Sequence, residues 1–330
     1  MRGTQTFGLV LFMVAAVGCG GGGEGDGDDD GTTIDAAGDG DGQIPSDYTA
    51  LIGRPWSLPA GATDTYRCAR LTLTEDTYIT NIMADAPVGT HHTVLSIASS
   101  RVDGPDGEYN CSVGELGTVM LYASGVGTSP LDFPTDVGIK IPAGTQIHLN
   151  LHLYNASDNP ISGTSTIMVK KVAQQPPILA EMVFAGKILF GIEPNNPPQG
   201  TQLPADHVAE VVGGCTVPNN GSYTLFATWP HMHKLAVHQK IELIRGGTPQ
   251  MLHDGAFNFE EQNYYRESPE VQVQPGDQIR VTCGYINNTG ATVNFGDSSD
   301  TEMCFAGLYR YPAKDSGLFQ CTDVPGGLPF

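Results

Sequence analysis

The sequence predicts an all-β protein with two tandem antiparallel β-sandwich domains of jelly-roll-like form, preceded by a disordered acidic N-terminal tether. Many short runs are rich in Val, Ile, Thr and aromatic residues, which favour strands. Turns such as PAGT, PGDQ and NNTG separate these runs, and 42 of the 330 residues are Gly. No amphipathic helix pattern exceeds about two turns, so we expect sheets packed on sheets.

The strand-like runs fall into two sets on either side of a proline pair. The first set covers residues 66–73, 77–84, 92–99, 118–125, 146–155 and 165–172, and the second covers residues 223–233, 240–245, 271–274, 278–286, 292–296 and 303–311. Pro176 and Pro177 lie between the sets and remove two backbone donors from any strand there. We therefore predict an N-terminal domain over residues 48–175 and a C-terminal domain over residues 176–330.

Each predicted domain contains a turn followed by a strongly alternating strand. PAGT precedes IHLNLHL at residues 147–153, and PGDQ precedes IRVTCGY at residues 279–285. This similarity suggests that the two sandwiches are related.

The N-terminus resembles an export signal. Arg2 precedes an apolar run over residues 7–17, which is too short to span a bilayer but suits a secretory h-region. The run ends in AVGC, so Cys19 resembles the lipidated cysteine of a bacterial lipoprotein, with Ala16 where Leu is usual. We predict a lipoprotein signal over residues 1–19 and a lipid-anchored, extracytoplasmic protein of the bacterial cell envelope. A simple secretory peptide is the alternative.

Residues 20–47 are rich in Gly and Asp and have almost no apolar side chains, which is typical of a disordered tether. The formal net charge of the chain is −20, with 16 Lys and Arg against 36 Asp and Glu. Nucleic acid is excluded as a partner because phosphate contacts need clustered basic residues. The only membrane association expected is through the N-terminal lipid.

An even number of cysteines remains once Cys19 is set aside, which in an exported chain predicts disulfides. Cys68 and Cys111 lie in the first half and pair with each other if each half folds as a unit. The second half allows three pairings among its cysteines, Cys215, Cys283, Cys304 and Cys321.

Two histidine motifs have spacings that suit metal binding. In HMH, His231 and His233 share one face of a strand about 6.6 Å apart, within reach of one ion. In GTHHTV, His91 and His92 point to opposite faces of a regular strand. They can bind one metal only at a strand end or bulge, which Gly89 makes possible.

A third histidine motif is QIHLNLHLYN. Alternation places His148 and His152 on one face, but about 13 Å of strand separates them, so at most one belongs to a given site. We interpret His148 as a core or surface residue. Met303 adds a different kind of ligand, because a thioether is soft and favours Cu(I) over zinc, magnesium or calcium. A disulfide at the adjacent Cys304 would hold the backbone that carries Met303.

The ordered motifs TYRC, GTHHTV, LNLHLYN, HMH and EMC, over residues 65–321, resemble the copper type II, ascorbate-dependent monooxygenases. This family includes peptidylglycine α-hydroxylating monooxygenase and dopamine β-monooxygenase. The resemblance implies two β-sandwich domains that face each other across a water-filled cleft. It also implies the disulfides Cys68–Cys111, Cys215–Cys321 and Cys283–Cys304.

The resemblance further implies two separate mononuclear copper sites. His91, His92 and His152 would hold the electron-transfer copper, and His231, His233 and Met303 the copper that reacts with O2. Ascorbate or another one-electron reductant would supply electrons, and an activated C–H of a small organic or peptide-like substrate would be hydroxylated.

Residues near the second predicted site depart from the peptidylglycine enzymes. Trp229 stands where those enzymes carry an arginine. Phe305 and Gly307 replace the polar residues expected shortly after the methionine. Tyr309 could take the place of one of them only after a shift of one residue. These changes favour an apolar or aromatic substrate over a peptide that ends in glycine.

Two other functions fit parts of the pattern. A copper-binding surface lipoprotein could retain the ligands without turnover. A zinc hydrolase could use HMH, but the chain has no HExxH-type motif and Met303 is a poor zinc ligand.

Overall fold

The computed structural model describes residues 44–98, 102–112, 119–195, 208–219, 221–296, 298–314 and 317–323. The predicted lipoprotein signal with Cys19, and residues 20–43 of the predicted tether, lie outside the described residues. The last part of the predicted tether, residues 44–47, includes a turn in which the Tyr48 amide donates to the Pro45 carbonyl. Asp47 also forms an ion pair of 2.8 Å with Lys170 of the first sandwich.

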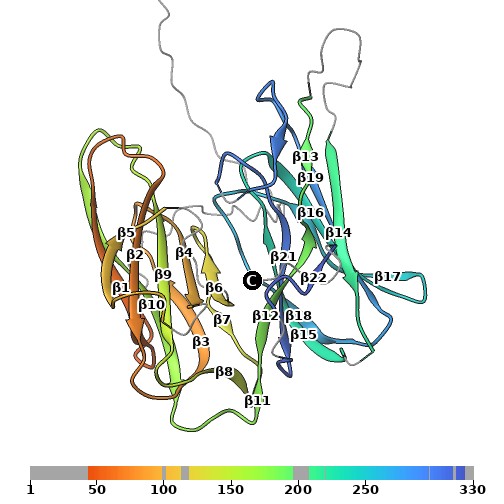
Figure 1. Cartoon of the computed structure of the whole chain (residues 1–330), viewed down its shortest axis with the longest axis horizontal. Coiled ribbons are helices and arrows are strands. Elements are labelled where there is room, and N and C mark those ends of the chain that lie inside the picture. Colours follow the sequence, from red (N-terminus) through yellow and green to blue (C-terminus); the bar gives the residue numbers. More distant parts are fainter. Residues whose placement is uncertain are drawn as a thin grey trace, which may run out of the picture. The chain divides into compact units, whose positions relative to one another are not determined.

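All the regular secondary structure in the described residues consists of β-strands, which confirms the all-β prediction (Figure 1). The first sandwich pairs a sheet of order β1-β10-β3-β8-β11, with β7 beside β3, with a sheet of order β5-β2-β9-β4-β6. Its strands are β1 (Thr49–Leu58), β2 (Thr65–Thr72), β3 (Thr77–Asp85), β4 (Thr90–Ile97), β5 (Gly107–Asn110), β6 (Val119–Ser124), β7 (Leu131–Asp132), β8 (Val137–Ile141), β9 (Gln146–Leu153), β10 (Ile161–Val172) and β11 (Ile178–Leu179).

The second sandwich pairs a sheet of order β18-β15-β21-β12-β22 with a sheet of order β14-β19-β16-β17, and β13 pairs separately with β20. Its strands are β12 (Glu181–Lys187), β13 (Gly191–Ile192), β14 (Ala209–Thr216), β15 (Tyr223–His231), β16 (Ala236–Arg245), β17 (Thr248–Ala256), β18 (Tyr265–Val273), β19 (Gln278–Tyr285), β20 (Val293–Asn294), β21 (Cys304–Tyr311) and β22 (Cys321–Thr322). Within the described residues, no helix has the length and apolar character needed to span a membrane.

The two sandwiches share one strand order. In the first, the sheets contain β1-β10-β3-β8 and β2-β9-β4-β6; in the second, the corresponding strands are β12-β21-β15-β18 and β14-β19-β16-β17. This two-sheet arrangement of eight strands is a jelly roll, as predicted. Strand β9 corresponds to β19, and these two strands follow the PAGT and PGDQ turns that suggested a relationship.

The strand that follows the proline pair belongs to the first sandwich by its hydrogen bonds. Ile178 and Leu179 of β11 pair in parallel with Val137 and Gly138 of β8. Strand β11 lies just after the predicted domain boundary between residues 175 and 176. That boundary stays a prediction.

The core residues follow the expected alternation along β9. Ile147, Leu149, Leu151 and Leu153 are fully buried, and His148, Asn150 and His152 on the other face are also buried. Burial of polar groups requires partners, since an unpaired polar group costs free energy. His148 lies 3.6 Å from Asp103, which agrees with its interpretation as a residue outside the metal sites.

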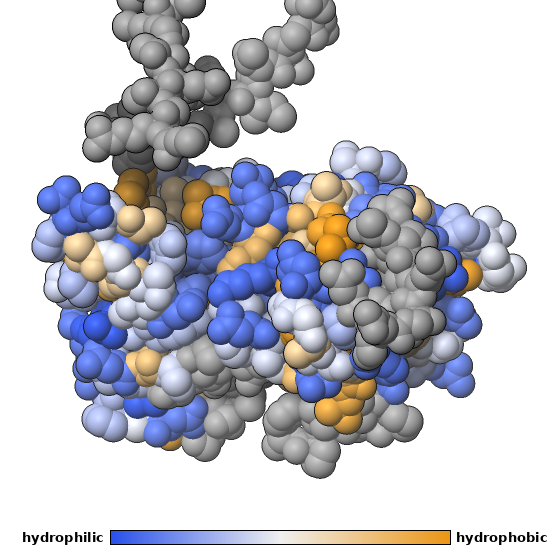
Figure 2. Space-filling model, turned by 90° about the horizontal axis from the view of Figure 1, so that it is seen from above, coloured by the Kyte–Doolittle hydropathy of each residue, from blue (hydrophilic) through white to orange (hydrophobic). Residues whose placement is uncertain are grey.

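Aromatic side chains join the two sandwiches, which belong to one compact unit over residues 40–330. The rings of Phe133 and Phe226 are 5.4 Å apart, and those of Tyr122 and Tyr264 are 5.5 Å apart. Along this seam, packed rings fill the space between the sandwiches. On the face shown in Figure 2, hydrophobic residues form small patches among hydrophilic ones.

The disulfide pairs implied by the resemblance are confirmed: Cys68–Cys111, Cys215–Cys321 and Cys283–Cys304. The last two each connect the two sheets of the second sandwich, because Cys215 and Cys283 lie on β14 and β19 whereas Cys304 and Cys321 lie on β21 and β22. Cross-links of this kind stabilise a domain by roughly 2–4 kcal/mol each.

Candidate metal centres

The first group of histidines lies where β4 and β9 pair. His92 is opposite His152, and the register shifts between Thr90 and His92, so His91 occupies a bulge. Gly89, just before β4, has a φ of 103° that favours glycine. The bulge that the adjacent histidines require is therefore present.

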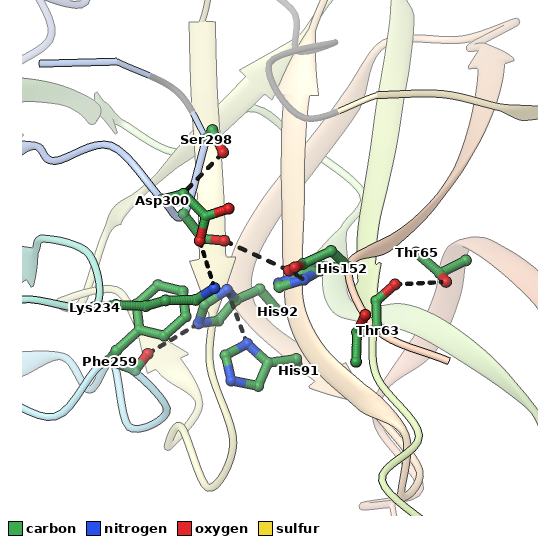
Figure 3. A network of polar contacts seen from close by, with 11 residues as sticks. Thr63, Thr65, His91, His92, His152, Lys234, Phe259, Ser298 and Asp300 are labelled. Carbon is green, nitrogen blue, oxygen red and sulfur yellow. Dashed lines mark hydrogen bonds and ion pairs between the residues drawn. The ribbon is translucent and has the colours of Figure 1, made fainter. Parts of the chain in front are cut away.

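The three rings lie close to one another, with ring centres 4.2 Å, 5.0 Å and 5.7 Å apart (Figure 3). Nδ1 of His91 lies 3.3 Å from Nδ1 of His92. One nitrogen from each of His91, His92 and His152 lies within 4.8 Å of the others, and this is the one such group of His, Cys, Asp or Glu in the described part of the chain. Three convergent imidazoles form a set suited to copper or zinc.

Hydrogen bonds indicate which ring nitrogens remain free in this group. Nε2 of His92 lies 3.2 Å from the carbonyl oxygen of Phe259, and Nε2 of His152 lies 2.9 Å from Oδ1 of Asp64. A ring nitrogen that donates to such an oxygen carries the proton, so the Nδ1 atoms keep their lone pairs. Tyr66 stacks on His152 with ring centres 4.7 Å apart, which fixes the orientation of that ring.

These histidines favour the neutral form that a metal requires. Burial, together with the neighbouring His152, lowers the pKa of His91 to about 4. Burial and the nearby His91 hold the pKa of His92 well below its usual value. Burial also lowers the pKa of His152, although its bond to Asp64 acts in the opposite direction.

The second group lies at the ends of β15 and β21. His231 pairs with Phe305 in the last pair of this antiparallel register, and His233 and Met303 each lie two residues beyond that pair. The rings of His231 and His233 are 5.4 Å apart and nearly perpendicular. Their two side chains and that of Met303 line the same cavity.

In this group the ring nitrogens bonded to an oxygen are Nδ1 atoms, whereas in the first group they are Nε2 atoms. Nδ1 of His231 lies 2.8 Å from Oε1 of Gln262, and Nδ1 of His233 lies 2.9 Å from the carbonyl oxygen of Thr301. These bonds leave both Nε2 atoms with lone pairs. Burial, with a contribution from His233, lowers the pKa of His231 to about 3, so its ring is neutral at neutral pH.

Glu302 holds the backbone on which this group stands. Its carboxylate accepts hydrogen bonds from the amides of His233 and Leu235, at 2.9 Å and 2.6 Å. Burial raises the pKa of Glu302 to about 7 against the effect of these backbone donors. Sequence reasoning missed this role, although Glu302 is part of the EMC motif. The hydroxyl of Tyr285 also donates to the carbonyl of Met303, at 2.6 Å.

Residues between β17 and β18 connect the two groups, and the sequence contained no motif for them. The amide of Gln262 contacts Nε2 of His92 at 3.1 Å and Nδ1 of His231 at 2.8 Å. Phe259 packs against rings from both groups, with centres 5.0 Å from His92 and 6.1 Å from His233. Figure 3 shows Phe259 beside His92.

A cavity borders both groups and has an empty volume of about 890 Å³, part of it continuous with solvent. It is lined by Tyr66, His92, Val94, Met120, Asn150, His152, Phe184, Trp229, His231, His233, Phe259, Ser299, Met303, Phe305, Leu318 and Phe319. Trp229 and Phe305 line it as the sequence suggested, whereas Gly307 and Tyr309 do not. Tyr309 is buried elsewhere, with its hydroxyl 3.2 Å from that of Tyr264.

Comparison with known proteins links the chain to one family. Residues 186–324 match the domain described as copper type II ascorbate-dependent monooxygenase, C-terminal domain. The chain is 24% identical over 251 residues to the human protein named "Putative DBH-like monooxygenase protein 2", covering 71% of this chain and 49% of the human protein. The chain thus spans about half the length of that curated relative.

Solved structures show only distant likeness. The major capsid protein P2 of bacteriophage PM2 matches with a TM-score of 0.32 and 10% identity, over 81% of this chain and 100% of the capsid chain. A triple jelly-roll protein of an archaeal virus matches with a TM-score of 0.22 and 9% identity, over 80% of this chain and 56% of the viral chain. At these scores neither likeness bears on function.

Proposed function

Because the chain belongs to the copper type II ascorbate-dependent monooxygenases, we propose that it is a copper-dependent monooxygenase with two separate mononuclear copper sites. It hydroxylates an activated C–H of a small organic or peptide-like substrate, with O2 and a one-electron reductant such as ascorbate. The observation that carries the proposal is the cavity bordered by both ligand groups, the first through His92 and His152 and the second through His231, His233 and Met303.

The donor sets fit copper. His91, His92 and His152 would hold one ion, His92 and His152 through their Nδ1 atoms. His231, His233 and Met303 would hold the other through two Nε2 atoms and a thioether. A set with a thioether favours Cu(I) over zinc. When bound, copper supplies one-electron transfer and the activation of O2.

The protein groups around the ligands fix their geometry before metal arrives. Asp64 and the Phe259 carbonyl hold the rings of the first group, and Gln262 and the Thr301 carbonyl hold those of the second. Partners of this kind orient ligand rings and raise their basicity. Apolar side chains of the cavity, including Phe184 and Phe305, exclude water from the side of the second group.

We also propose that the protein is exported and anchored to the bacterial cell envelope by a lipid on Cys19. The disulfides support an oxidising compartment, since cytoplasmic thiols are kept reduced. The proposed partners are the substrate, O2 and the reductant.

Metal content tests the proposed function. We expect the purified chain, loaded with copper and dialysed, to hold about two copper ions, and His152→Ala and His231→Ala each to hold about one. His148→Gln is the matched control, because His148 lies on the same strand as His152 but outside the ligand groups. Uptake of O2 that depends on the reductant then separates a monooxygenase from a copper-binding lipoprotein without turnover. A preference for zinc, or fewer than two coppers, contradicts the two-site proposal.

A further inference from the structure

The wall of the cavity near the second ligand group is built from stacked aromatic rings. Phe184 lies 5.0 Å from Phe305 and 5.7 Å from Phe319, measured between ring centres, and Phe305 lies 5.4 Å from Phe319. Trp229 stacks on His231 at 4.9 Å. Rings already held in such positions present flat apolar surfaces to a further ring.

No Lys, Arg, Asp or Glu lines this cavity among the described residues. The nearby Lys234 and Asp300 are exposed and pair with each other at 3.0 Å. Polar groups of the lining already have partners: the indole nitrogen of Trp229 donates to the Gln262 carbonyl, and the amide of Asn150 donates to the Ser112 carbonyl. A charged ligand would therefore lose its hydration without gaining an opposite charge from the side chains that line the cavity, which costs several kcal/mol.

We propose that this cavity binds an uncharged aromatic molecule, and that such a molecule is the substrate class of the chain. This inference rests on the proposed function, because the cavity borders His231, His233 and Met303 on one side and His92 and His152 on the other.

Three probes of similar size and different charge test the substrate class: 2-phenylethanol, 2-phenylethylamine and 3-phenylpropionate. Their binding to the full chain is measured by calorimetry at pH 7 after removal of copper, because a bound metal ion would itself attract the carboxylate or the amine. We expect the neutral alcohol to bind at least about tenfold more tightly than either charged probe. If the amine or the carboxylate binds as tightly as the alcohol, the proposal is wrong.

A charge placed in the cavity locates the binding. Leu318 is partly buried and lines the cavity. In the variant Leu318→Lys, we expect binding of 3-phenylpropionate to strengthen at least about tenfold relative to binding of the alcohol. Leu318→Met keeps the apolar lining and retains the original order of affinities. Val212→Lys adds the same charge at a residue that is 50% exposed and outside the cavity, and leaves the order unchanged. An unchanged order in Leu318→Lys overturns the proposal.

The two proposals fail in different ways. Equal binding of the three probes to the copper-free chain counts against the substrate class. Preferred binding of the alcohol, with two coppers bound but no O2 uptake on addition of reductant, counts against the monooxygenase reaction instead.

Discussion

The side-chain nitrogen of Gln262 lies 3.1 Å from Nε2 of His92, although the two residues are 170 positions apart in sequence. The oxygen of the same amide accepts a hydrogen bond from His231. Gln262 is buried, so solvent does not replace these contacts. One side chain therefore touches a candidate ligand in each of the two ligand groups.

Gln262→Ala should weaken copper binding at both sites, by about tenfold or more at the second. His231 loses the oxygen that accepts from its ring, and the Phe259 carbonyl that accepts from His92 loses its Gln262 donor. Each site is measured alone by competitive copper titration, in His231→Ala for the first site and in His152→Ala for the second. Gln262→Glu keeps an oxygen for His231 and should spare the second site more than the first. Unchanged affinity at both sites in Gln262→Ala would show that the amide does not orient the ligands.

Asp64 should affect the first site alone. Its carboxylate contacts His152, and its φ of 44° is tolerated by Gly and Asn. We expect Asp64→Gly to weaken copper binding at the first site about tenfold and Asp64→Asn, which keeps an acceptor, to weaken it less.

Copper affinity of the second site, measured in the His152→Ala background, is the control for Asp64→Gly. Asp300→Asn is a second control, because Asp300 pairs with Lys234 and not with a ligand. Equal losses of copper affinity at both sites would mean that Asp64→Gly disturbs the fold as a whole and not only the ring of His152.

Local patterns predicted much of the molecule. Alternation identified β9 and its buried leucines, and the spacing of His231 and His233 placed both rings on one face. Adjacent histidines in a strand required a bulge, and the register shift before His92 supplies it. These features depend on residues close together in sequence, so the sequence was sufficient to predict them.

Contacts between the sandwiches could not be predicted in the same way. Gln262 and Phe259 lie in a connection between strands, where no periodic pattern indicates which way a side chain points. Their contacts with His92 arise only when the two sandwiches pack together. For the same reason, the packing of Tyr122 against Tyr264 could not be predicted from the sequence.

The shared strand order does not place the two sites in equivalent positions. The first site uses β4 and β9, whereas the second uses the ends of β15 and β21, which correspond to β3 and β10. The sites therefore lie on different sheets of the two jelly rolls. Although they lie on different sheets, both ligand groups border one cavity.

Glu302→Ala should destabilise the fold and the second site together. Glu302 is fully buried, and its loss leaves the amides of His233 and Leu235 without acceptors. Each unsatisfied donor costs about 1–3 kcal/mol, so we expect a loss of about 2–4 kcal/mol in the free energy of unfolding, measured with urea. Glu302→Gln keeps one side-chain oxygen and should lose less. Wild-type stability in Glu302→Ala would refute this role.

Glu267, on β18, should make the stability of the chain depend on pH. Burial raises the pKa of its carboxyl from 4.5 to about 7, and Oε1 is buried without a hydrogen-bond partner. Between pH 4.5 and about pH 7 the folded chain binds more protons at Glu267 than the unfolded chain does. The contribution of Glu267 to stability therefore falls as pH rises through this range.

We expect Glu267→Gln to remove this dependence, because the amide stays neutral. Its free energy of unfolding should exceed that of the wild type by about 1 kcal/mol at pH 8, after allowance for partial exposure, and match it near pH 4.5. Urea unfolding at both pH values measures the difference. Glu210→Gln, at an exposed position on β14, is the control and should show no such change. A difference between Glu267→Gln and the wild type that is the same at both pH values would mean that the carboxyl titrates equally in the folded and unfolded chains.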